Sequence, residues 1–287
     1  MNPTLRASLW MLGAIFSFTM MAIAGRELGG TFDTFEIMMW RSVFGVVIVL
    51  ALAFWFGTQR QIGVGAIRLH FIRNIFHFAG QNLWFYAVTA VPLAQVFALE
   101  FTTPLWVIVL SIFILGERLT PMRAVGALMG FAGILIVARP DPSGLNAGLI
   151  AAATCAIFFA LTYVFTKKLT RTESITAIMF YLTFFQLIFG IIAAGYDGDI
   201  RVPGLPDLPW LLLVGVCGLL AHFCITKALS IAPAAVVAPI DFARLPIIAI
   251  VAVLVYGEAL DLWVFVGAVI IFAGNYLNIW SETRKTA

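Results

Sequence analysis

The sequence has 287 residues, of which 62% are hydrophobic and only 11% are charged, and its mean hydropathy is +1.04. A soluble domain carries about 25% charged residues, so this chain has too few to cover a water-facing surface. Its three cysteines exclude a disulfide-rich secreted scaffold, and its hydrophobicity excludes a disordered chain. The apolar runs are continuous, which favours a helical polytopic membrane protein over a spanning β-barrel.

Ten apolar runs are each long enough for a helix to cross about 30 Å of hydrocarbon. In chain order they cover residues 5–25, 35–56, 69–91, 93–115, 121–138, 145–167, 174–194, 208–231, 233–256 and 262–280. The first run ends in the small-x-small triplet 22–24, as a signal peptide does, but its counterpart in the second half favours a span. We therefore predict an all-α fold with ten transmembrane helices.

The lysines and arginines in the loops and near the ends of the spans are distributed unevenly between the two sides of the membrane. Eleven fall on the side of the N-terminus and three on the opposite side. Positive loops stay in the cytoplasm, so both termini are expected to be cytoplasmic. The net charge of +3 reflects this topology and does not indicate a nucleic-acid partner.

The sequence repeats itself at a distance of 141 residues. Gly116-Glu117 falls on Gly257-Glu258, and 14 of the 54 positions between residues 85 and 138 are identical to their counterparts. We therefore divide the chain into a first repeat, 1–141, and a second repeat, 142–287, of five spans each. Because five is odd, the second repeat must enter the membrane from the opposite face, which predicts a 5+5 inverted-topology repeat.

Inverted repeats are typical of secondary transporters, which bind substrate near the midplane where the repeats meet. Two units of one shape and opposite orientation can exchange conformations, which turns an outward-open state into an inward-open one. The alternative is a duplicated pair that simply builds a stable bundle.

The ten spans, the repeat, the Gly-Glu pair closing the fourth and ninth spans and the glycine-spaced fifth and tenth spans resemble the EamA family of the drug/metabolite transporter superfamily. The resemblance covers essentially the whole chain, and within the family it is greatest to bacterial amino-acid and metabolite exporters of the YddG type. It implies a multi-pass exporter of the inner membrane with cytoplasmic termini, not an enzyme.

Polar residues within spans usually face the interior of the bundle. Arg73, His77, Gln81 and Trp84 follow one another at helical spacing on one face of the third span, as expected for a cavity wall. Glu100 and Asp241 occupy equivalent positions of the two repeats. The candidate substrate-binding residues are His77, Gln81, Trp84, Tyr86, Glu100, Phe101, Tyr163, His222, Lys227, Asp241 and Arg244.

Structural roles remain open for several of these charges. Asp241 and Arg244 are spaced i, i+3 and could neutralise each other, and Arg41 could pair with Glu36 at a helix end. His77 could be a satisfied interhelical contact without a ligand.

Two further features of the sequence have structural interpretations. Glu117 and Glu258 are expected to cap helices and not to relay protons. Prolines in the fourth and ninth spans predict bends beside the candidate site.

An amino acid is the expected substrate, because a zwitterion needs both signs of charge at one site. Organic anions or nucleoside-like metabolites are the alternative, and a membrane enzyme is less well supported, since no catalytic or metal-binding motif is present. No catalytic residue, metal or cofactor is predicted. The expected partners are the small-molecule substrate and membrane lipid, and the protein is expected to be a monomer or a homodimer, with Gly126-x-x-x-Gly130 as a close-packing face.

Overall fold

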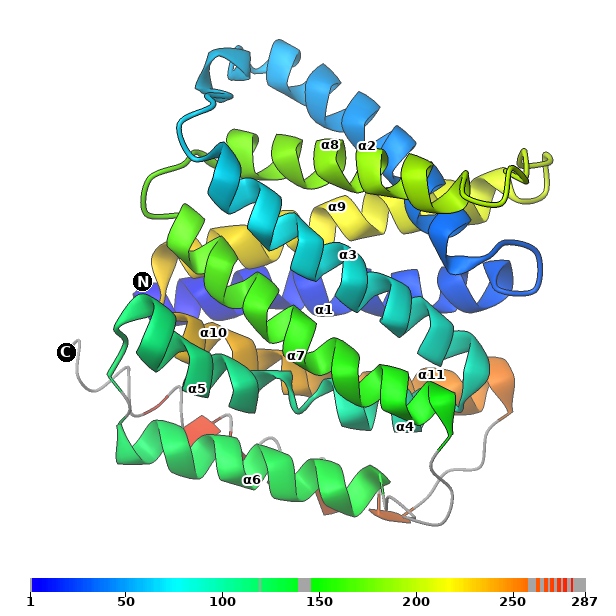
Figure 1. Cartoon of the computed structure of the whole chain (residues 1–287). Coiled ribbons are helices and arrows are strands. Elements are labelled where there is room, and N and C mark those ends of the chain that lie inside the picture. Colours follow the sequence, from blue (N-terminus) through cyan, green and yellow to red (C-terminus); the bar gives the residue numbers. More distant parts are fainter. Residues whose placement is uncertain are drawn as a thin grey trace.

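The computed structural model describes residues 2–118, 120–138 and 146–257, with scattered residues between 262 and 280. Within these ranges every regular element is a helix (Figure 1). The helices are α1 (Pro3–Leu28), α2 (Thr34–Trp55), η1 (Gln59–Gln61), α3 (Ile67–Ala90), α4 (Leu93–Glu100), α5 (Thr103–Leu115), α6 (Pro121–Ala138), α7 (Ala147–Leu169), α8 (Ile175–Ala194), α9 (Leu208–Ile231), α10 (Ala234–Ile240), η3 (Asp241–Ala243) and α11 (Arg244–Tyr256).

Six segments of the described chain are long and apolar enough to cross a membrane, namely α1, α2, α7, α8, α9 and the stretch Ala234–Tyr256. The helix α5 and the part Ala124–Gly133 of α6 are shorter apolar helices. The chain is therefore a multi-pass helical membrane protein. The tenth predicted span, 262–280, lies largely outside the described residues, so the count of ten remains a prediction.

Helix ends agree between positions that are 141 residues apart. Asp33 caps the N-terminus of α2 and Ser174 caps that of α8, each accepting a hydrogen bond from a backbone N–H of the first turn. Gly116 and Gly257 follow the last residues of α5 and α11 with φ values of +69° and +64°. Only glycine adopts this left-handed conformation without steric cost, which explains why both repeats carry it at this point.

The packing of the helices is exchanged between the two halves. The helix α1 packs on α9, and its counterpart α7 packs on α3, the counterpart of α9. The helices α2 and α8, which are also counterparts, pack on each other. Figure 1 shows α1 starting beside the marked N-terminus at the left, whereas α7 starts at the right and runs the opposite way. This exchange is what a two-fold axis between oppositely directed repeats produces.

The fourth and ninth predicted spans are each interrupted near the centre of the bundle. A break at Phe101-Thr102 separates α4 from α5, and the 3-10 turn η3 separates α10 from α11. Prolines lie beside both interruptions, in the first turn of α5 and inside α10, as the bend prediction requires. The interruptions place Glu100, at the end of α4, and Asp241, at the start of η3, in the lining of the same cavity.

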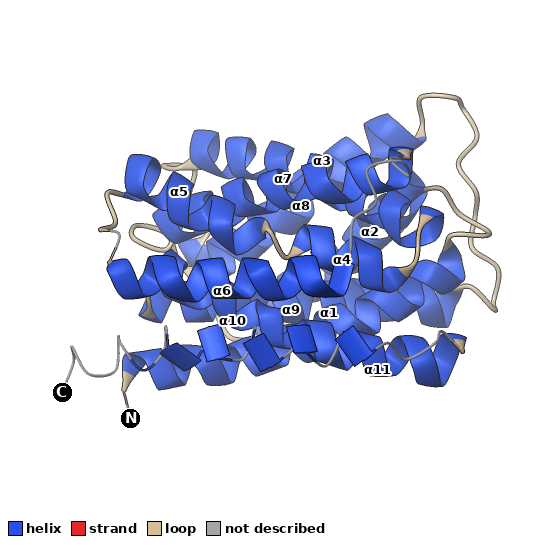
Figure 2. Cartoon of the chain, turned by 90° about the horizontal axis from the view of Figure 1, so that it is seen from below, coloured by secondary structure: helices blue, strands red, loops and turns tan. Residues whose placement is uncertain are grey.

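The helix α6 lies at the outside of the bundle, nearest the viewer when the molecule is seen from below (Figure 2). A Cβ on Gly130 of α6 would lie 2.3 Å from the Phe242 ring, so the glycine permits close approach to the ninth span. Gly126 of the same motif approaches Gly274, whose Cβ would lie 2.6 Å from its carbonyl oxygen. The predicted glycine face thus packs within the chain.

Candidate functional site

A buried cavity of about 40 Å³ lies at the centre of the bundle, between α1, α3, α7, α9 and the two interrupted spans. A volume of this size holds a few water molecules but no metabolite. Side chains therefore fill most of the space between the repeats in this structure.

Equivalent positions of both repeats line this cavity. Six pairs of lining residues are each separated by 141 positions. They are Phe18 and Phe159, Met21 and Thr162, Gln81 and His222, Trp84 and Ile225, Glu100 and Asp241, and Thr103 and Arg244. A two-fold axis between the repeats would therefore pass through the cavity. Such an interface is where secondary transporters of this architecture place substrate.

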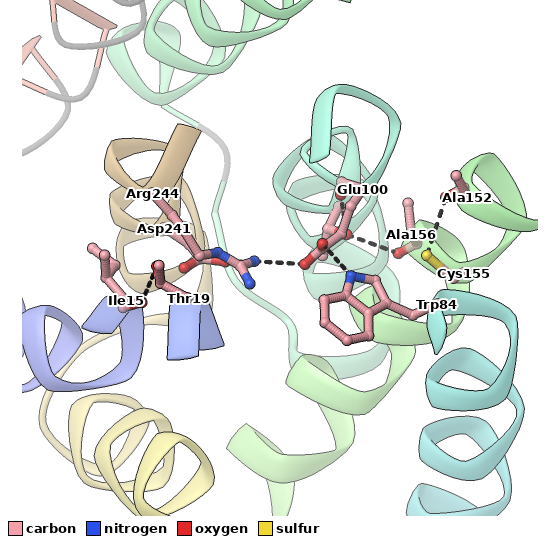
Figure 3. Close-up of polar contacts among 10 residues, drawn as sticks. Ile15, Thr19, Trp84, Glu100, Ala152, Cys155, Ala156, Asp241 and Arg244 are labelled. Atoms are coloured by element: carbon pink, nitrogen blue, oxygen red, sulfur yellow. Dashed lines mark hydrogen bonds and ion pairs between the residues drawn. The ribbon is translucent and has the colours of Figure 1, made fainter. Parts of the chain in front are cut away.

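Two carboxylates and one guanidinium form an ionic cluster on one side of the cavity (Figure 3). Arg244 donates from Nη2 to Glu100 Oε1 at 2.5 Å and to Asp241 Oδ2 at 2.7 Å. Trp84 Nε1 donates to the second oxygen of Glu100 at 2.6 Å, which joins α3 to α4. All four side chains are buried. The cluster connects the two repeats, because Glu100 belongs to the first and Arg244 to the second.

Aromatic rings surround the guanidinium of Arg244. Its Cζ lies 4.8 Å from the ring centroid of Phe18 and 5.1 Å from those of Phe97 and Phe101. Cation–π contacts of this kind gain strength when water is excluded. The rings therefore hold the cation in place beside an apolar wall.

The break between α4 and α5 is stabilised by a side-chain hydroxyl. Thr103 Oγ1 donates to the carbonyl oxygen of Glu100 at 2.5 Å and also lies 3.2 Å from the carbonyl oxygen of Ala156 on α7. Because backbone groups need partners inside a membrane, this residue makes the interruption tolerable.

Two histidines face each other across the cavity. The rings of His77 on α3 and His222 on α9 are perpendicular, with centroids 4.5 Å apart. Within the described chain, both nitrogens of His77 and Nε2 of His222 lack hydrogen-bond partners. Unpartnered polar atoms are costly in the interior, so these nitrogens are available to a ligand or to water.

A second polar region lies along α3, away from the ionic cluster. Arg73 donates from Nε to Thr166 Oγ1 at 3.1 Å and from Nη1 to Asn74 Oδ1 at 3.0 Å. Arg41 of α2 donates to Gln81 Oε1. Both arginines are buried, and their partners here are neutral.

The structure brings nine of the eleven predicted site residues to the cavity lining. These are His77, Gln81, Trp84, Glu100, Phe101, Tyr163, His222, Asp241 and Arg244. The remaining two, Tyr86 and Lys227, lie elsewhere. The side chain of Tyr86 is 45% exposed, and Lys227 Nζ lies 6.0 Å from the centroid of Phe223.

Two expected contacts differ in the structure. Arg41 does not pair with Glu36, because the Glu36 carboxylate accepts from the backbone N–H groups of Asp33 and Arg201. Glu117 caps a helix as expected, but the helix is α10 of the other repeat, where Ala234 N donates to its Oε1 at 3.0 Å. Glu258 lies outside the described residues.

Several lining residues carry no distinctive signal in the sequence. Phe18, Met21, Phe159 and Thr162 line the cavity, yet phenylalanine, methionine and threonine are common in membrane helices. The repeat supplies the missing signal, because residues 18 and 159 and residues 21 and 162 are counterparts. Pairing the repeats would have added Thr103 and Ile225, the counterparts of the predicted residues Arg244 and Trp84, which also line the cavity.

The EamA-like transporter family matches the chain twice, over residues 5–139 and 146–280. The two matches together span nearly the whole chain. The division into repeats at residues 141 and 142 remains a prediction in its exact boundary.

Relatives along the full length are transporters of two named metabolites. An S-adenosylmethionine uptake transporter of Rickettsia bellii is 27% identical over 96% of this chain and 94% of its own length. A riboflavin transporter of Brucella anthropi is 31% identical over 88% of this chain and 90% of its own length. A riboflavin transporter of Vibrio cholerae is 28% identical over 98% of this chain and 95% of its own length. These relatives do not support the narrower resemblance to amino-acid exporters.

A solved crystal structure has the same fold, with a TM-score of 0.78 at 19% sequence identity, and the match covers 98% of this chain and 99% of that chain.

Proposed function

The chain belongs to the EamA-like transporter family, and we propose that it is a secondary carrier that moves a small polar metabolite across the inner membrane by alternating access. The observation that carries this proposal is the cavity between the repeats. It is lined by equivalent positions of both halves and contains buried charges of both signs. Charged groups inside a membrane bundle mark a pathway for polar solutes.

The small size of the cavity supports a mechanism in which the two repeats move relative to each other. A compartment of about 40 Å³ has to expand before a metabolite enters, and the interrupted spans are where such movement can occur. The contact between Arg244 and Glu100 closes the cavity across the repeat interface at 2.5 Å. Opening toward either side of the membrane would separate these two groups.

The length of the polar wall favours a nucleoside-sized or flavin-sized substrate over a simple amino acid. Arg73 and Trp84 both line the cavity and are eleven residues apart on α3, so their Cα atoms are about 16 Å apart along the helix. The two charges of an amino acid are too close together to reach both ends. S-adenosylmethionine and riboflavin, named for the relatives, each combine a flat ring system with a polar chain.

An amino acid remains the second candidate, because the cavity offers carboxylates and guanidinium groups together. Aromatic residues such as Trp84 and Phe101 would accept an aromatic amino acid side chain. Export is not part of the proposal, because it was expected from the exporter resemblance and a relative is named for uptake.

Flux measurements in proteoliposomes test the proposal. Labelled S-adenosylmethionine, riboflavin, adenosine and tryptophan are each offered to liposomes with the protein and to empty liposomes. Saturable flux of one ring-bearing probe supports a carrier of the proposed class, whereas flux of tryptophan alone would shift the substrate to amino acids. Absence of flux for every probe, with the protein shown to be folded, would refute the carrier. A non-saturating flux would indicate a channel.

A further inference from the structure

We propose that Arg73, which lines the same wall of the cavity as Gln81, is a binding site for an anionic oxygen group of the substrate, a carboxylate or a phosphate. The inference rests on the proposed function, since it assigns one end of the same cavity to one chemical group of the cargo. It goes beyond that function by stating the charge that the cargo must carry.

The side chain of Arg73 is buried yet incompletely used by the protein. It is 1% exposed, lines the cavity, and donates from Nε and Nη1 to Thr166 and Asn74. Its Nη2 has no hydrogen-bond partner in the part of the chain that the structure describes, and this nitrogen is not completely shielded from solvent. A guanidinium that the protein fixes through Nε and Nη1, while Nη2 remains free to donate, is suited to binding an oxyanion.

Arg41 strengthens this end through Gln81. Its guanidinium donates to Gln81 Oε1, so the side-chain oxygen of Gln81 is occupied and the amide nitrogen remains a donor toward the cavity. Gly218 makes room for this arrangement, because a Cβ there would lie 2.4 Å from Arg41 Nε. The two arginines are close enough to influence each other electrostatically. An anion bound at Arg73 would thus also feel the charge of Arg41, while the amide of Gln81 faces a part of the cargo about 12 Å further along α3.

The two ends of the cavity carry excess charge of opposite sign, positive near Arg73 and negative near Glu100 and Asp241. Within the described residues, no carboxylate pairs with Arg41 or Arg73. Glu173 lies at this end, but its carboxylate contacts His70 at 3.6 Å. At the other end Glu100 and Asp241 share the guanidinium of Arg244, and Asp241 Oδ1 has no partner among the residues that the structure describes.

This imbalance indicates how the cargo is oriented. A buried cation without a counter-charge is unfavourable, so an incoming anion gains most at Arg73. The cationic or hydrogen-bond-donating part of the same molecule would then face the carboxylates. His77, which lies between Arg73 and Trp84 on α3, has both ring nitrogens unpartnered and available to the middle of the cargo.

Matched probe pairs test the anion site directly by binding to the purified full-length protein in detergent. One pair is S-adenosylmethionine and its decarboxylated form, which differ by one carboxylate, and the other is flavin mononucleotide and riboflavin, which differ by one phosphate. We call the member of each pair that carries the extra carboxylate or phosphate the anionic member. In at least one pair we expect it to bind about tenfold more tightly or better than its partner. The pair that shows the preference identifies the group as carboxylate or phosphate.

Variants assign the preference to Arg73. In Arg73→Gln the anionic member should lose about tenfold in affinity while its partner is unchanged, so the ratio within the pair approaches one. Arg68→Gln is the matched control, since Arg68 is an exposed arginine on the same helix, and it should keep the ratio. Arg73→Lys keeps the positive charge but lacks the forked guanidinium, and it replaces Arg73→Gln as the test variant if Arg73→Gln does not fold.

The outcomes separate this inference from the proposed function. Equal binding of both members of each pair by the unmodified protein would overturn the anion site. An equal loss for both members in Arg73→Gln would also overturn it, because a structural role predicts that result. If the anion preference is present but no probe is transported into liposomes, the carrier proposal fails and the anion site stands.

Discussion

Replacing Arg244 with methionine tests the ionic cluster at the centre of the bundle. The substitution keeps an apolar side chain of similar length against Phe18, Phe97 and Phe101, but it removes the cation that holds Glu100 and Asp241. Two buried carboxylates would then lie near each other without the charge that compensates them.

The expected cost follows from the geometry. Arg244 makes two ion pairs of 2.5 and 2.7 Å and is 2% exposed, so solvent screens neither contact. Removing one partner of a buried ion pair costs about 3–5 kcal/mol, because the remaining charge is left buried. At about 2–4 °C per kcal/mol for a chain of roughly this size, the melting temperature should fall by roughly 10 °C.

Thermal unfolding in detergent measures this change, with transport in liposomes as the second readout. The triple variant Arg244→Met, Glu100→Gln, Asp241→Asn removes every charge of the cluster and should recover most of the stability, since a neutral, well-packed core replaces a buried ionic group at little cost. It should not recover transport. Arg68→Met, at an exposed position, is the control and should change stability by less than about 0.5 kcal/mol. The reasoning fails if Arg244→Met is no less stable than this control, or if the triple variant is less stable than the single one.

Three further substitutions test separate contacts by the same unfolding measurement. Trp84→Phe removes a 2.6 Å hydrogen bond to a carboxylate and should cost about 1.5–3 kcal/mol; no loss would mean that the bond contributes nothing. Gly190→Ala would place a Cβ 2.9 Å from the Cα of Met39, so α8 must move away from α2 at a cost of about 1–3 kcal/mol, whereas Gly63→Ala, with open space around it, should be neutral. Glu117→Gln weakens the cap on α10 and should cost about 1 kcal/mol, and an unchanged melting temperature would argue against the cap.

The membrane fold could be predicted from the sequence because the bilayer imposes a simple rule. Continuous apolar runs have to be helices, and a repeat of five spans has to be inverted. The interruptions at Phe101 and Asp241 were expected in part, from the prolines nearby. Their positions could not be located, because they depend on local partners such as the Thr103 hydroxyl, which bonds a carbonyl on its own span and one on α7.

Which polar residues line the site could be predicted from the sequence, but which of them contact one another could not. Charged and aromatic residues at helical spacing on α3 pointed to one wall, and the structure places Trp84 and Gln81 there. The partner of Arg41 could not be derived, because spacing favoured Glu36 on its own helix over Gln81, 40 residues away. The prediction also placed Tyr86 at the site because it is the repeat counterpart of Lys227, although a residue two positions beyond Trp84 lies on the other face of α3, where Tyr86 is exposed.

The repeat symmetry breaks where the ionic cluster forms, and this asymmetry bears on the mechanism. Glu100 and Asp241 are counterparts and both acidic, but the counterpart of Arg244 is Thr103, so one cation serves two carboxylates. Its bond to Asp241 lies within one repeat, three residues away, and moves with that repeat. Its bond to Glu100 crosses between α11 and α4, and in the proposed carrier cycle this is the bond that breaks when the repeats separate. A carboxylate released in this way is free for the cationic part of a cargo, so opening of the cavity and exposure of the binding group become one event.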